Sequence, residues 1–167
     1  HLIIDGFEVY SNSTINRREG IGIRENSKYI TIKNCYVHDC GCNGIGMRHS
    51  DYVTIEKNVV RDNAKISDYN CSGISIWEAR QYDDKEGYHI IVRQNIAFEN
   101  ECRLPFTPAG FDVPTDGNGI IIDYLHETGY EADILVENNL SFNNGGRGIH
   151  VFRSDNVTVQ NNTVWHN

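Results

Sequence analysis

An asparagine recurs along this chain at fixed distances behind a pair of apolar residues. Six segments align, each with an apolar residue at its start and another two positions later. Asparagine occupies the fifth position after the start in four segments and the tenth position in five. A frame that returns in this way indicates a repeat protein whose units stack on one another. The segments begin at Leu2, Ile30, Val53, Ile90, Ile134 and Val157.

A second motif, Gly-Ile-x-apolar, closes five of the repeats, at residues 20–23, 44–47, 73–76, 119–122 and 148–151. The shortest repeat, from Ile30 to Val53, spans 23 residues. That length is too short for two helices with their turns, but it fits three short strands joined by tight corners. We therefore predict an all-β fold, a parallel β-helix solenoid of about six coils.

The asparagines are expected to form ladders at the corners of the coils. Stacked coils lie about 4.8 Å apart, so a residue type repeated at one corner forms a column. An asparagine side chain is both donor and acceptor, and it can bond to the asparagines above and below it. It also tolerates the left-handed backbone of a sharp corner. The two predicted columns are Asn58, Asn95, Asn139 and Asn162, and Asn63, Asn100, Asn144 and Asn167.

Composition narrows the classes of function. The 167 residues form one predicted domain, 1–167, with a net charge of −8 and no basic patch, which argues against nucleic acid as a partner. No apolar stretch is long enough to span a membrane. Both ends resemble uncapped coils, so we expect a fragment of a longer solenoid. These features suit a secreted or cell-surface protein that contacts carbohydrate, and they leave the oligomeric state open.

The cysteines fall at defined places in the repeat. Cys35 and Cys40 occupy ladder positions and are interpreted as small corner residues. Cys42 and Cys71 each lie two residues before the glycine of consecutive repeats. Their Cα atoms should then be one coil apart, within disulfide reach. Cys102, two residues after a ladder asparagine, is the alternative partner.

Insertions interrupt the repeat on both sides of the Gly-Ile-x-apolar strand. Insertions that map to one face of a repeat protein commonly mark its binding face. The sheet built from these strands is therefore the predicted floor of a groove, with the insertions as its walls. Three insertions precede the strand, at 13–19, 64–72 and 101–118, and two follow it, at 78–88 and 124–132.

Alternate residues of the floor strands should point into the groove. One outward row begins with small residues, which leave room for a ligand. This row is Gly22, Gly46, Ser75, Ile121 and His150. The next row is Arg24, Arg48, Trp77, Asp123 and Phe152. Two arginines one coil apart repel each other. Either a carboxylate such as Glu25 or Glu78 offsets that repulsion, or an anionic ligand such as a uronate does. Trp77 and Phe152 are sugar-stacking platforms or covers packed under the loops.

The insertions also contain acidic residues. Asp116-Gly-Asn118-Gly alternates oxygen ligands with glycine, as calcium loops do, although the same residues also favour an ordinary turn. Asp84 belongs to a run of charged residues at 83–86. Asp84, Asp116 and Asp123 are the candidate ligands for Ca²⁺, the one cofactor that the sequence suggests.

The ladder, the Gly-Ile-x-apolar strand and the one-sided insertions resemble the right-handed parallel β-helix superfamily of pectate lyases and related polysaccharide enzymes. The resemblance implies an acidic polysaccharide as partner, acidic calcium ligands, and a basic residue on the groove floor. The polygalacturonase branch carries Asn-Thr-Asp, Asp-Asp, Gly-His-Gly and Arg-Ile-Lys in that order. Here Asp83-Asp84 precedes Thr115-Asp116-Gly117, and the last two motifs are missing.

Three functions are compatible with these residues. The first is a lyase that cleaves a uronate polymer by β-elimination. Its candidate catalytic residues are Arg48, His49, His150 and Lys85, and its candidate substrate-binding residues are Arg24, Trp77, Glu78, Arg147 and Phe152. The second is an inverting hydrolase with two carboxyl groups about 6.5–9.5 Å apart, drawn from Glu78, Asp84, Asp116 and Asp123. The third is a non-catalytic glycan-binding or spacer solenoid.

Overall fold

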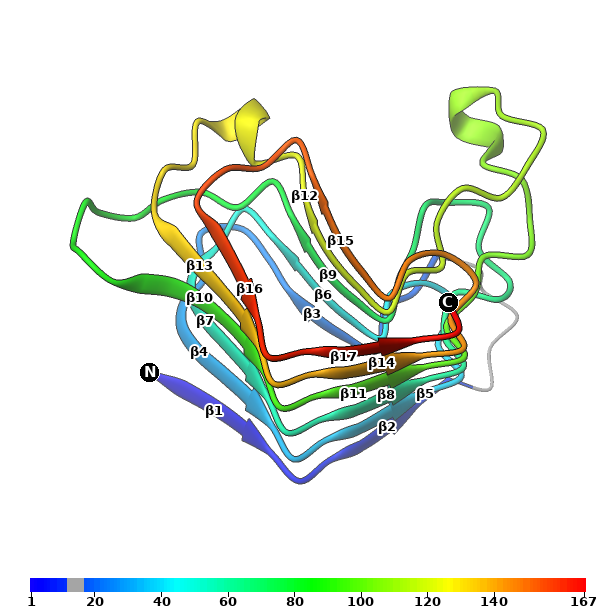
Figure 1. Cartoon of the computed structure of the whole chain (residues 1–167), viewed down its shortest axis with the longest axis horizontal. Coiled ribbons are helices and arrows are strands. Elements are labelled where there is room, and N and C mark those ends of the chain that lie inside the picture. The colour runs from blue at the N-terminus through cyan, green and yellow to red at the C-terminus, as the bar shows by residue number, and fades with distance from the viewer. Residues whose placement is uncertain (12–16) are drawn as a thin grey trace.

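The computed structural model describes residues 1–11 and 17–167, and its strands stack as three parallel sheets around one core (Figure 1). Sheet A contains β1 (Leu2–Asp5), β4 (Lys28–Lys33), β7 (Asp51–Glu56), β10 (Tyr88–Arg93), β13 (Asp133–Glu137) and β16 (Val157–Gln160). Sheet B contains β2 (Glu8–Tyr10), β5 (Tyr36–His38), β8 (Val59–Arg61), β11 (Ile96–Phe98), β14 (Leu140–Phe142) and β17 (Thr163–Trp165). Sheet C contains β3 (Ile21–Ile23), β6 (Ile45–Arg48), β9 (Ile74–Trp77), β12 (Ile120–Asp123) and β15 (Ile149–Phe152). The predicted parallel β-helix is confirmed.

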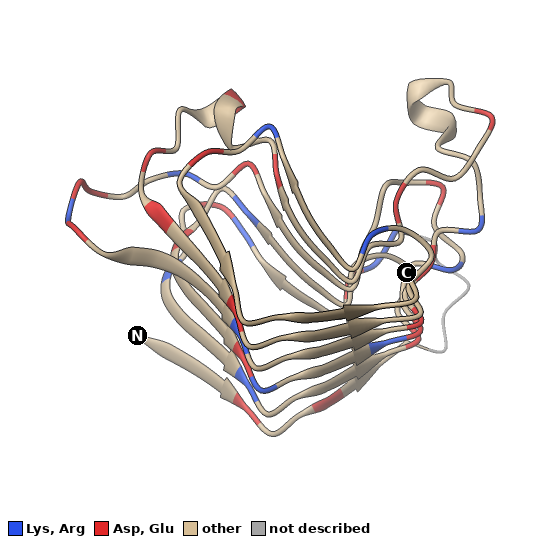
Figure 2. Ribbon diagram, viewed as in Figure 1, with Lys and Arg blue, Asp and Glu red and all other residues tan. Residues whose placement is uncertain are grey.

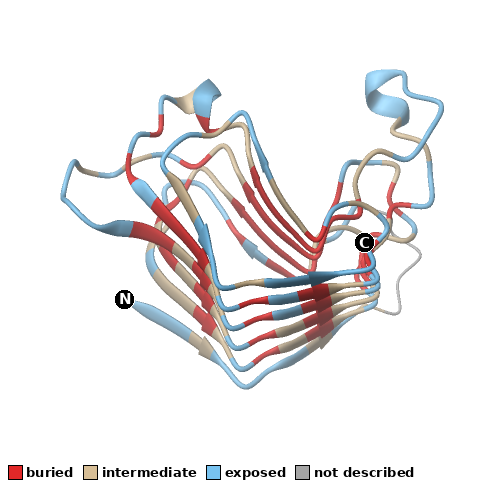
Figure 3. Cartoon of the chain, in the orientation of Figure 1, coloured by how far each residue is buried: buried red, intermediate tan, exposed pale blue. Residues whose placement is uncertain are grey.

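Alternation along each strand builds the core. In β7, for example, Val53 and Ile55 are buried while Thr54 and Glu56 lie on the outer face. Because successive side chains point to opposite faces, every coil sends its alternate Ile and Val residues inward. The core is therefore a stack of aliphatic layers enclosed by the three sheets (Figure 3).

The two asparagine ladders are present. In the first, Asn58 donates to Asn95, Asn95 to Asn139 and Asn139 to Asn162, with Nδ2–Oδ1 distances of 3.0, 3.1 and 3.0 Å. In the second, Asn63, Asn100, Asn144 and Asn167 are linked over 2.9, 3.0 and 2.7 Å. Asn162 is only half-buried and Asn167 is exposed, so the prediction that all eight are buried is wrong for the last coil. Asn12, the matching residue of the first coil, lies outside the described residues.

The left-handed backbone of each corner falls one residue earlier than predicted. Lys57 and Gln94, directly before ladder asparagines, have φ values of 58° and 56°. The ladder asparagine itself needs a backbone that directs its side chain inward, so the residue before it makes the turn. The cysteines in the columns confirm this geometry, since the Cys35 and Cys40 amides donate to the side-chain oxygens of Asn58 and Asn63 over 2.9 and 3.0 Å.

Replacement of Asn95 by alanine should destabilise the solenoid by about 1–3 kcal/mol. Asn95 is 1% exposed; its Oδ1 accepts from both the amide and the side chain of Asn58, and its Nδ2 donates to the Ile55 carbonyl. The substitution leaves those buried groups without partners. Urea unfolding of Asn95→Ala measures the effect. Gln94→Asn is the matched control, because Gln94 is exposed and asparagine accepts its left-handed backbone; equal midpoints for the two variants would contradict the ladder account.

Besides the two asparagine ladders, charged residues form a column on the outer corner between sheets A and B (Figure 2). The register of sheet A stacks Asp5, Lys33, Glu56, Arg93 and Glu137 in that order, with the sign of the charge alternating from coil to coil. The Arg93 and Glu56 side chains approach to 2.7 Å. Opposite charges directly across neighbouring strands are favourable, so this corner supports the register that the buried ladders define.

A buried polar network occupies the corner from sheet C into sheet A. The carboxylate of Asp51 accepts from the Tyr130 hydroxyl (2.8 Å) and the Tyr82 amide (2.7 Å), and it lies 3.0 Å from His89 Nδ1. His89 Nε2 lies 2.9 Å from the Tyr52 hydroxyl and 3.0 Å from the Lys85 carbonyl. The network joins strands β7 and β10 to both insertions at this corner, 78–88 and 124–132.

Candidate functional site

The outer face of sheet C carries the two predicted rows of side chains. Backbone pairing aligns Arg48 with Trp77, Trp77 with Asp123, and Asp123 with Phe152. The neighbouring row runs through Gly46, Ser75, Ile121 and His150 on the same strands. The alternation of the floor strands that was read from the sequence is therefore correct.

A cavity of about 470 Å³ lies on this face. Its floor includes Ser75, Trp77 and Asp123, and one wall is formed by Tyr69 and Phe106, from the 64–72 and 101–118 insertions. The remaining lining residues are Arg17, Glu19, Arg24, Cys42, Asn43, Asn70, Cys71, Glu78 and Tyr124. Of the predicted insertion 13–19, residues 13–16 lie outside the described part of the chain, and Arg17 and Glu19 line the cavity.

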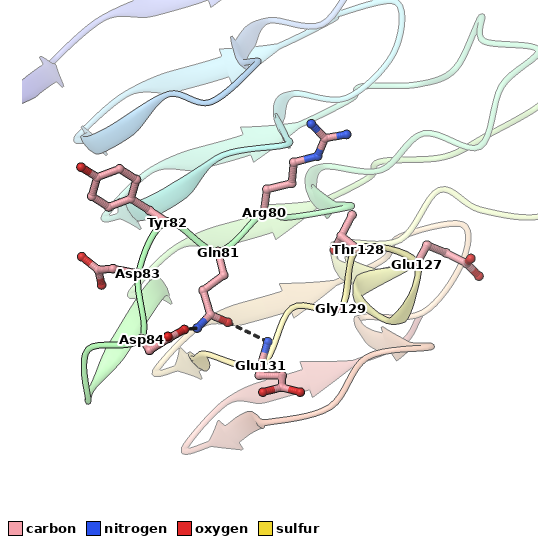
Figure 4. Close-up of a pocket in the computed structure, with 9 residues that line it drawn as sticks. All are labelled: Arg80, Gln81, Tyr82, Asp83, Asp84, Glu127, Thr128, Gly129 and Glu131. Carbon is pink, nitrogen blue, oxygen red and sulfur yellow. Dashed lines mark hydrogen bonds between the residues drawn. The ribbon is translucent and has the colours of Figure 1, made fainter.

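The insertions at the opposite corner do not form the second wall that the sequence suggested. Only their first residues, Glu78 and Tyr124, reach the cavity. The rest turn away from sheet C and pack on each other, because Gln81 accepts hydrogen bonds from the amides of Glu131 and Ala132 (both 2.9 Å). Together they line a separate polar cavity of about 650 Å³ (Figure 4).

The wall that carries Tyr69 is fixed by the predicted disulfide. Cys42 and Cys71 are bonded, with their Cα atoms 5.2 Å apart. Cys102 remains a free, buried thiol that donates to the Cys71 carbonyl over 3.2 Å, and burial raises the pKa of this thiol to about 11. The disulfide ties the 64–72 insertion to the preceding coil and itself forms part of the cavity lining.

Carboxylates offset the two floor arginines. Arg48 donates to Glu78 over 3.0 and 3.2 Å, and its guanidinium lies 4.1 Å above the centre of the Trp77 ring. Arg24 pairs with Glu19, a partner that the sequence analysis did not identify. The repulsion between the arginines is therefore relieved within the protein. Glu78, one of the two carboxylates expected from the sequence, pairs with Arg48, and Glu19, which was not expected, pairs with Arg24.

The small residues of the first row make room for this ion pair rather than for a ligand. A β-carbon on Gly46 would overlap the Glu19 carboxylate, and one on Gly22 would lie 3.0 Å from Glu19 Oε2. Glu19 also accepts from the Asn43 side chain over 2.7 Å. The glycines thus allow a carboxylate to lie flat on the floor of the cavity.

Asp123 is the carboxyl group with the most unusual environment on the floor. Burial raises its pKa to about 7, and the negative charges of Asp116 and Glu78 add to the effect. Its Oδ1 atom is buried and has no hydrogen-bond partner among the described residues. Near neutral pH this side chain is therefore partly protonated.

His150 provides the complementary group on the next strand. Its Nδ1 is the other buried side-chain atom without a partner in the described part of the chain. Burial lowers the pKa of His150, the nearby Arg147 lowers it further, and Asp116 acts in the opposite direction. The imidazole is therefore neutral at neutral pH and can accept a proton. A neutral imidazole and a partly protonated carboxyl group thus occupy adjacent strands of one sheet.

Arg147 lies close enough to His150 and Asp116 to influence their charges, on a well-supported loop. Its amide donates to Asn118 Oδ1 over 2.8 Å, and fully buried Asn118 also donates to Asp116 over 2.9 Å. Burial raises the pKa of Asp116, while His150 and Arg147 moderate the shift. The Arg147 guanidinium is exposed and forms no ion pair with any residue that the structure describes.

The remaining candidate residues lie in other surroundings. Lys85 is exposed and pairs with Asp83 over 2.9 Å on the 78–88 insertion. Asp84 lines the second cavity, where it accepts from Gln81 over 2.9 Å. Both ring nitrogens of His49 face carboxylates, Glu78 at 3.0 Å and Glu25 at 3.5 Å. The structure therefore brings none of these three to the floor with Asp123.

The candidate calcium ligands are only partly gathered. Asp116 and Asp123 are close enough to influence each other's charge, whereas Asp84 lies at the second cavity. Within residues 1–11 and 17–167, no three His, Cys, Asp or Glu side chains are grouped to hold a metal ion. Calcium binding stays a prediction for Asp116 and Asp123.

The two outer aromatic residues differ in their surroundings. Trp77 lies on the cavity floor beneath Arg48, so one of its faces is covered. Phe152 is more exposed and contacts Tyr124 edge-on, with ring centres 5.5 Å apart. Sequence reasoning missed Tyr69, Phe106 and Tyr124 as lining residues, because loop residues carry no periodic signal.

The chain belongs to the right-handed β-helix family, since the model of the right-handed beta helix region matches residues 2–164. Comparison with curated proteins and with solved structures found no match. In the described part of the chain, no helix has the length and apolar character needed to cross a membrane.

Proposed function

We propose that this β-helix protein is a polysaccharide lyase that cleaves a uronate-containing glycan by β-elimination on the outer face of sheet C. The observation that carries the proposal is that Asp123 and His150, on the adjacent strands β12 and β15, each have a buried side-chain atom with no hydrogen-bond partner among the described residues. Burial raises the pKa of Asp123 and lowers that of His150. Strongly shifted pKa values in a cavity are typical of groups that transfer protons in catalysis.

In this proposal each group has a defined role. Arg147 binds the C6 carboxylate and so acidifies the proton on C5. The His150 imidazole accepts that proton as general base, the C4–O4 bond breaks, and a C4–C5 double bond forms. Asp123 donates its proton to the departing O4 oxygen. Trp77 and Phe152 contact the sugar rings. Arg24, Arg48 and Glu78 shape the floor of the site. His49 contacts Glu78 and keeps its carboxylate in position.

An acidic polysaccharide as partner implies a protein that works outside the cell or on its surface. The Cys42–Cys71 disulfide supports this location, because disulfides persist in oxidising compartments. Asp116 and Asp123 are the residues that would hold Ca²⁺, which would there help to neutralise the substrate carboxylate. Asp123 would then be ionised, so Ca²⁺ at this place is an alternative to its role as proton donor.

An inverting hydrolase is the second candidate, and one observation favours it. Asp123 and Glu78 line the same cavity, and Glu78 bears the charge that helps to raise the pKa of Asp123. A protonated carboxyl and an ionised one in a shared site are the acid and base of an inverting glycosidase.

Incubation with a panel of acidic polysaccharides separates the two functions. Ultraviolet absorbance of an unsaturated product identifies a lyase, and new reducing ends without that absorbance identify a hydrolase; binding alone would overturn both.

Arg147→Ala should weaken the binding of an acidic oligosaccharide by about 1.5–3 kcal/mol, the range for a hydrogen bond to a charged group. The reason is that Arg147 is exposed and forms no ion pair with any described residue, whereas Arg48 is already paired with Glu78. Calorimetric titration gives the affinity. Arg80→Ala is the matched control, since Arg80 is exposed and lines the second cavity. Equal losses in both variants would indicate a non-specific effect of charge and remove Arg147 from the site.

A further inference from the structure

The two ends of the candidate site differ in chemical character. The cavity over β6 and β9 is bounded by the aromatic rings of Trp77, Tyr69 and Phe106, together with the Cys42–Cys71 disulfide. The end at β15 carries Arg147 and His150. The site therefore has one largely apolar end and one end with an available positive charge.

The positive charges within the cavity are already neutralised. Arg17 donates to Asp68 over 2.7 and 2.9 Å, and Arg24 pairs with Glu19. Glu78 also faces the cavity, paired with Arg48 from behind. A sugar carboxylate placed here would find each of these arginines already paired with a carboxylate of the described chain. It would lose its hydration without gaining an unpaired cation, so the cavity disfavours an acidic sugar.

The same lining suits an uncharged sugar. The apolar face of a pyranose ring packs against aromatic rings such as Trp77 and Phe106. Its hydroxyl groups can donate to the carboxylates of Glu19 and Glu78, and the side chains of Asn43 and Asn70 offer both donors and acceptors. Such hydrogen bonds to ionised acceptors are strong.

The two ends are spaced for neighbouring sugars of one chain. Trp77 pairs with Asp123, which is followed on the next coil by Phe152 and His150. Two strand spacings amount to about 10 Å, more than the width of one sugar ring. Asp123 lines the cavity at the side that faces β15, so it lies at the junction of the two ends.

We infer that the cavity over β6 and β9 is a subsite for a neutral sugar, so that the substrate is a mixed glycan in which a neutral sugar adjoins the uronate. This inference rests on the proposed function, because it takes the Arg147 end as the uronate subsite. A polymer built of uronates alone would fill the cavity poorly.

Binding to chemically matched polymers tests the inference. Intact polygalacturonate and alginate are each compared with the same polymer after partial reduction of its carboxyl groups to neutral sugars, which preserves linkage and stereochemistry. The partly reduced form should bind about tenfold more tightly or better. Equal or tighter binding of the intact polymers would overturn the neutral subsite. Preference for the reduced forms without an unsaturated product would retain the subsite and reject the lyase reaction.

Two variants sharpen the test. Phe106→Ala should weaken binding of the partly reduced polymers and leave binding of the intact polymers unchanged. Leu104 is exposed on the same insertion but lies outside the cavity lining, so Leu104→Ala should change the binding of neither form. Glu19→Gln releases Arg24 from its carboxylate partner and should shift the preference toward the intact polymers. A Glu19→Gln protein that folds and keeps the original preference, or a Phe106→Ala protein that binds all polymers normally, would contradict the subsite.

Discussion

Asp123→Asn should lower the rate of glycan cleavage by about 100- to 10,000-fold, the range for loss of a positioned general acid. Asparagine keeps the shape of the side chain but has no acidic proton to give to the leaving oxygen. In the wild-type protein the rate should fall as the pH rises above about 7, because Asp123 loses its proton there. It should also fall at low pH, when His150 becomes protonated.

Two further variants make this prediction specific. Asp123→Glu retains an acid and should keep part of the activity. Asp112→Asn changes an exposed carboxylate on the 101–118 insertion and should leave the rate unchanged. Initial rates on the polysaccharide that the protein cleaves provide the measurement. Full activity in Asp123→Asn would assign the acid to another residue.

Asp123 should also limit stability. Its pKa rises from 3.8 in the unfolded chain to about 7 in the folded one. Between those values the folded state binds a proton that the unfolded state has lost, so stability falls as the pH rises and the full cost is present above about 7. After allowance for solvent screening, Asp123→Asn should therefore stabilise the protein by about 1–2 kcal/mol at pH 8 and by little at pH 4. Thermal unfolding at the two pH values measures the difference, and destabilisation at pH 8 would refute the raised pKa.

The largest loss of stability is expected from the corner network. Asp51→Ala should cost about 3–5 kcal/mol, because it leaves several buried polar groups unsatisfied at about 1–3 kcal/mol each. Asp51 is 2% exposed and His89 3% exposed, and the substitution leaves His89, the Tyr130 hydroxyl and the Tyr82 amide without their acceptor. Both insertions at this corner would lose one of their attachments.

Chemical denaturation of Asp51→Ala and Asp84→Ala tests that prediction. Asp84 is exposed on the 78–88 insertion, so its loss should change the free energy of unfolding by about 0.5 kcal/mol or less. Tyr130→Phe removes one donor to Asp51 and should be intermediate, at about 1 kcal/mol. An Asp51→Ala cost no larger than that of Asp84→Ala would show that the network does not hold the corner.

The features that repeat with the coil could be predicted from the sequence. Stacking requires the same kind of residue at the same place in successive coils, and this requirement marks Asn58 and Asn95 as ladder residues. The same periodic frame placed Cys42 opposite Cys71 and ordered Arg48, Trp77 and Asp123 in one row. These predictions succeed because a shift in register would turn inward side chains outward.

The features that depend on the insertions could not be predicted in this way. The frame shows where the 78–88 insertion leaves the coil, but not the direction in which it folds. That direction depends on contacts such as Tyr52 with Asp83 (2.6 Å), His89 with Asp51, and Gln81 with Glu131. The raised pKa of Asp123 likewise results from burial under loops and from the nearby Asp116 and Glu78, none of which has a periodic signature.

The pKa of Asp123 tests the central claim most directly, since it needs neither the substrate nor an assay of activity. A titration followed by carbon NMR of the side-chain carboxyl groups, with Asp123→Asn to assign the signal, gives the value. We expect a midpoint near 7. A midpoint near 3.8, the ordinary value for an aspartate, would mean that Asp123 is ionised at neutral pH and cannot be the proton donor.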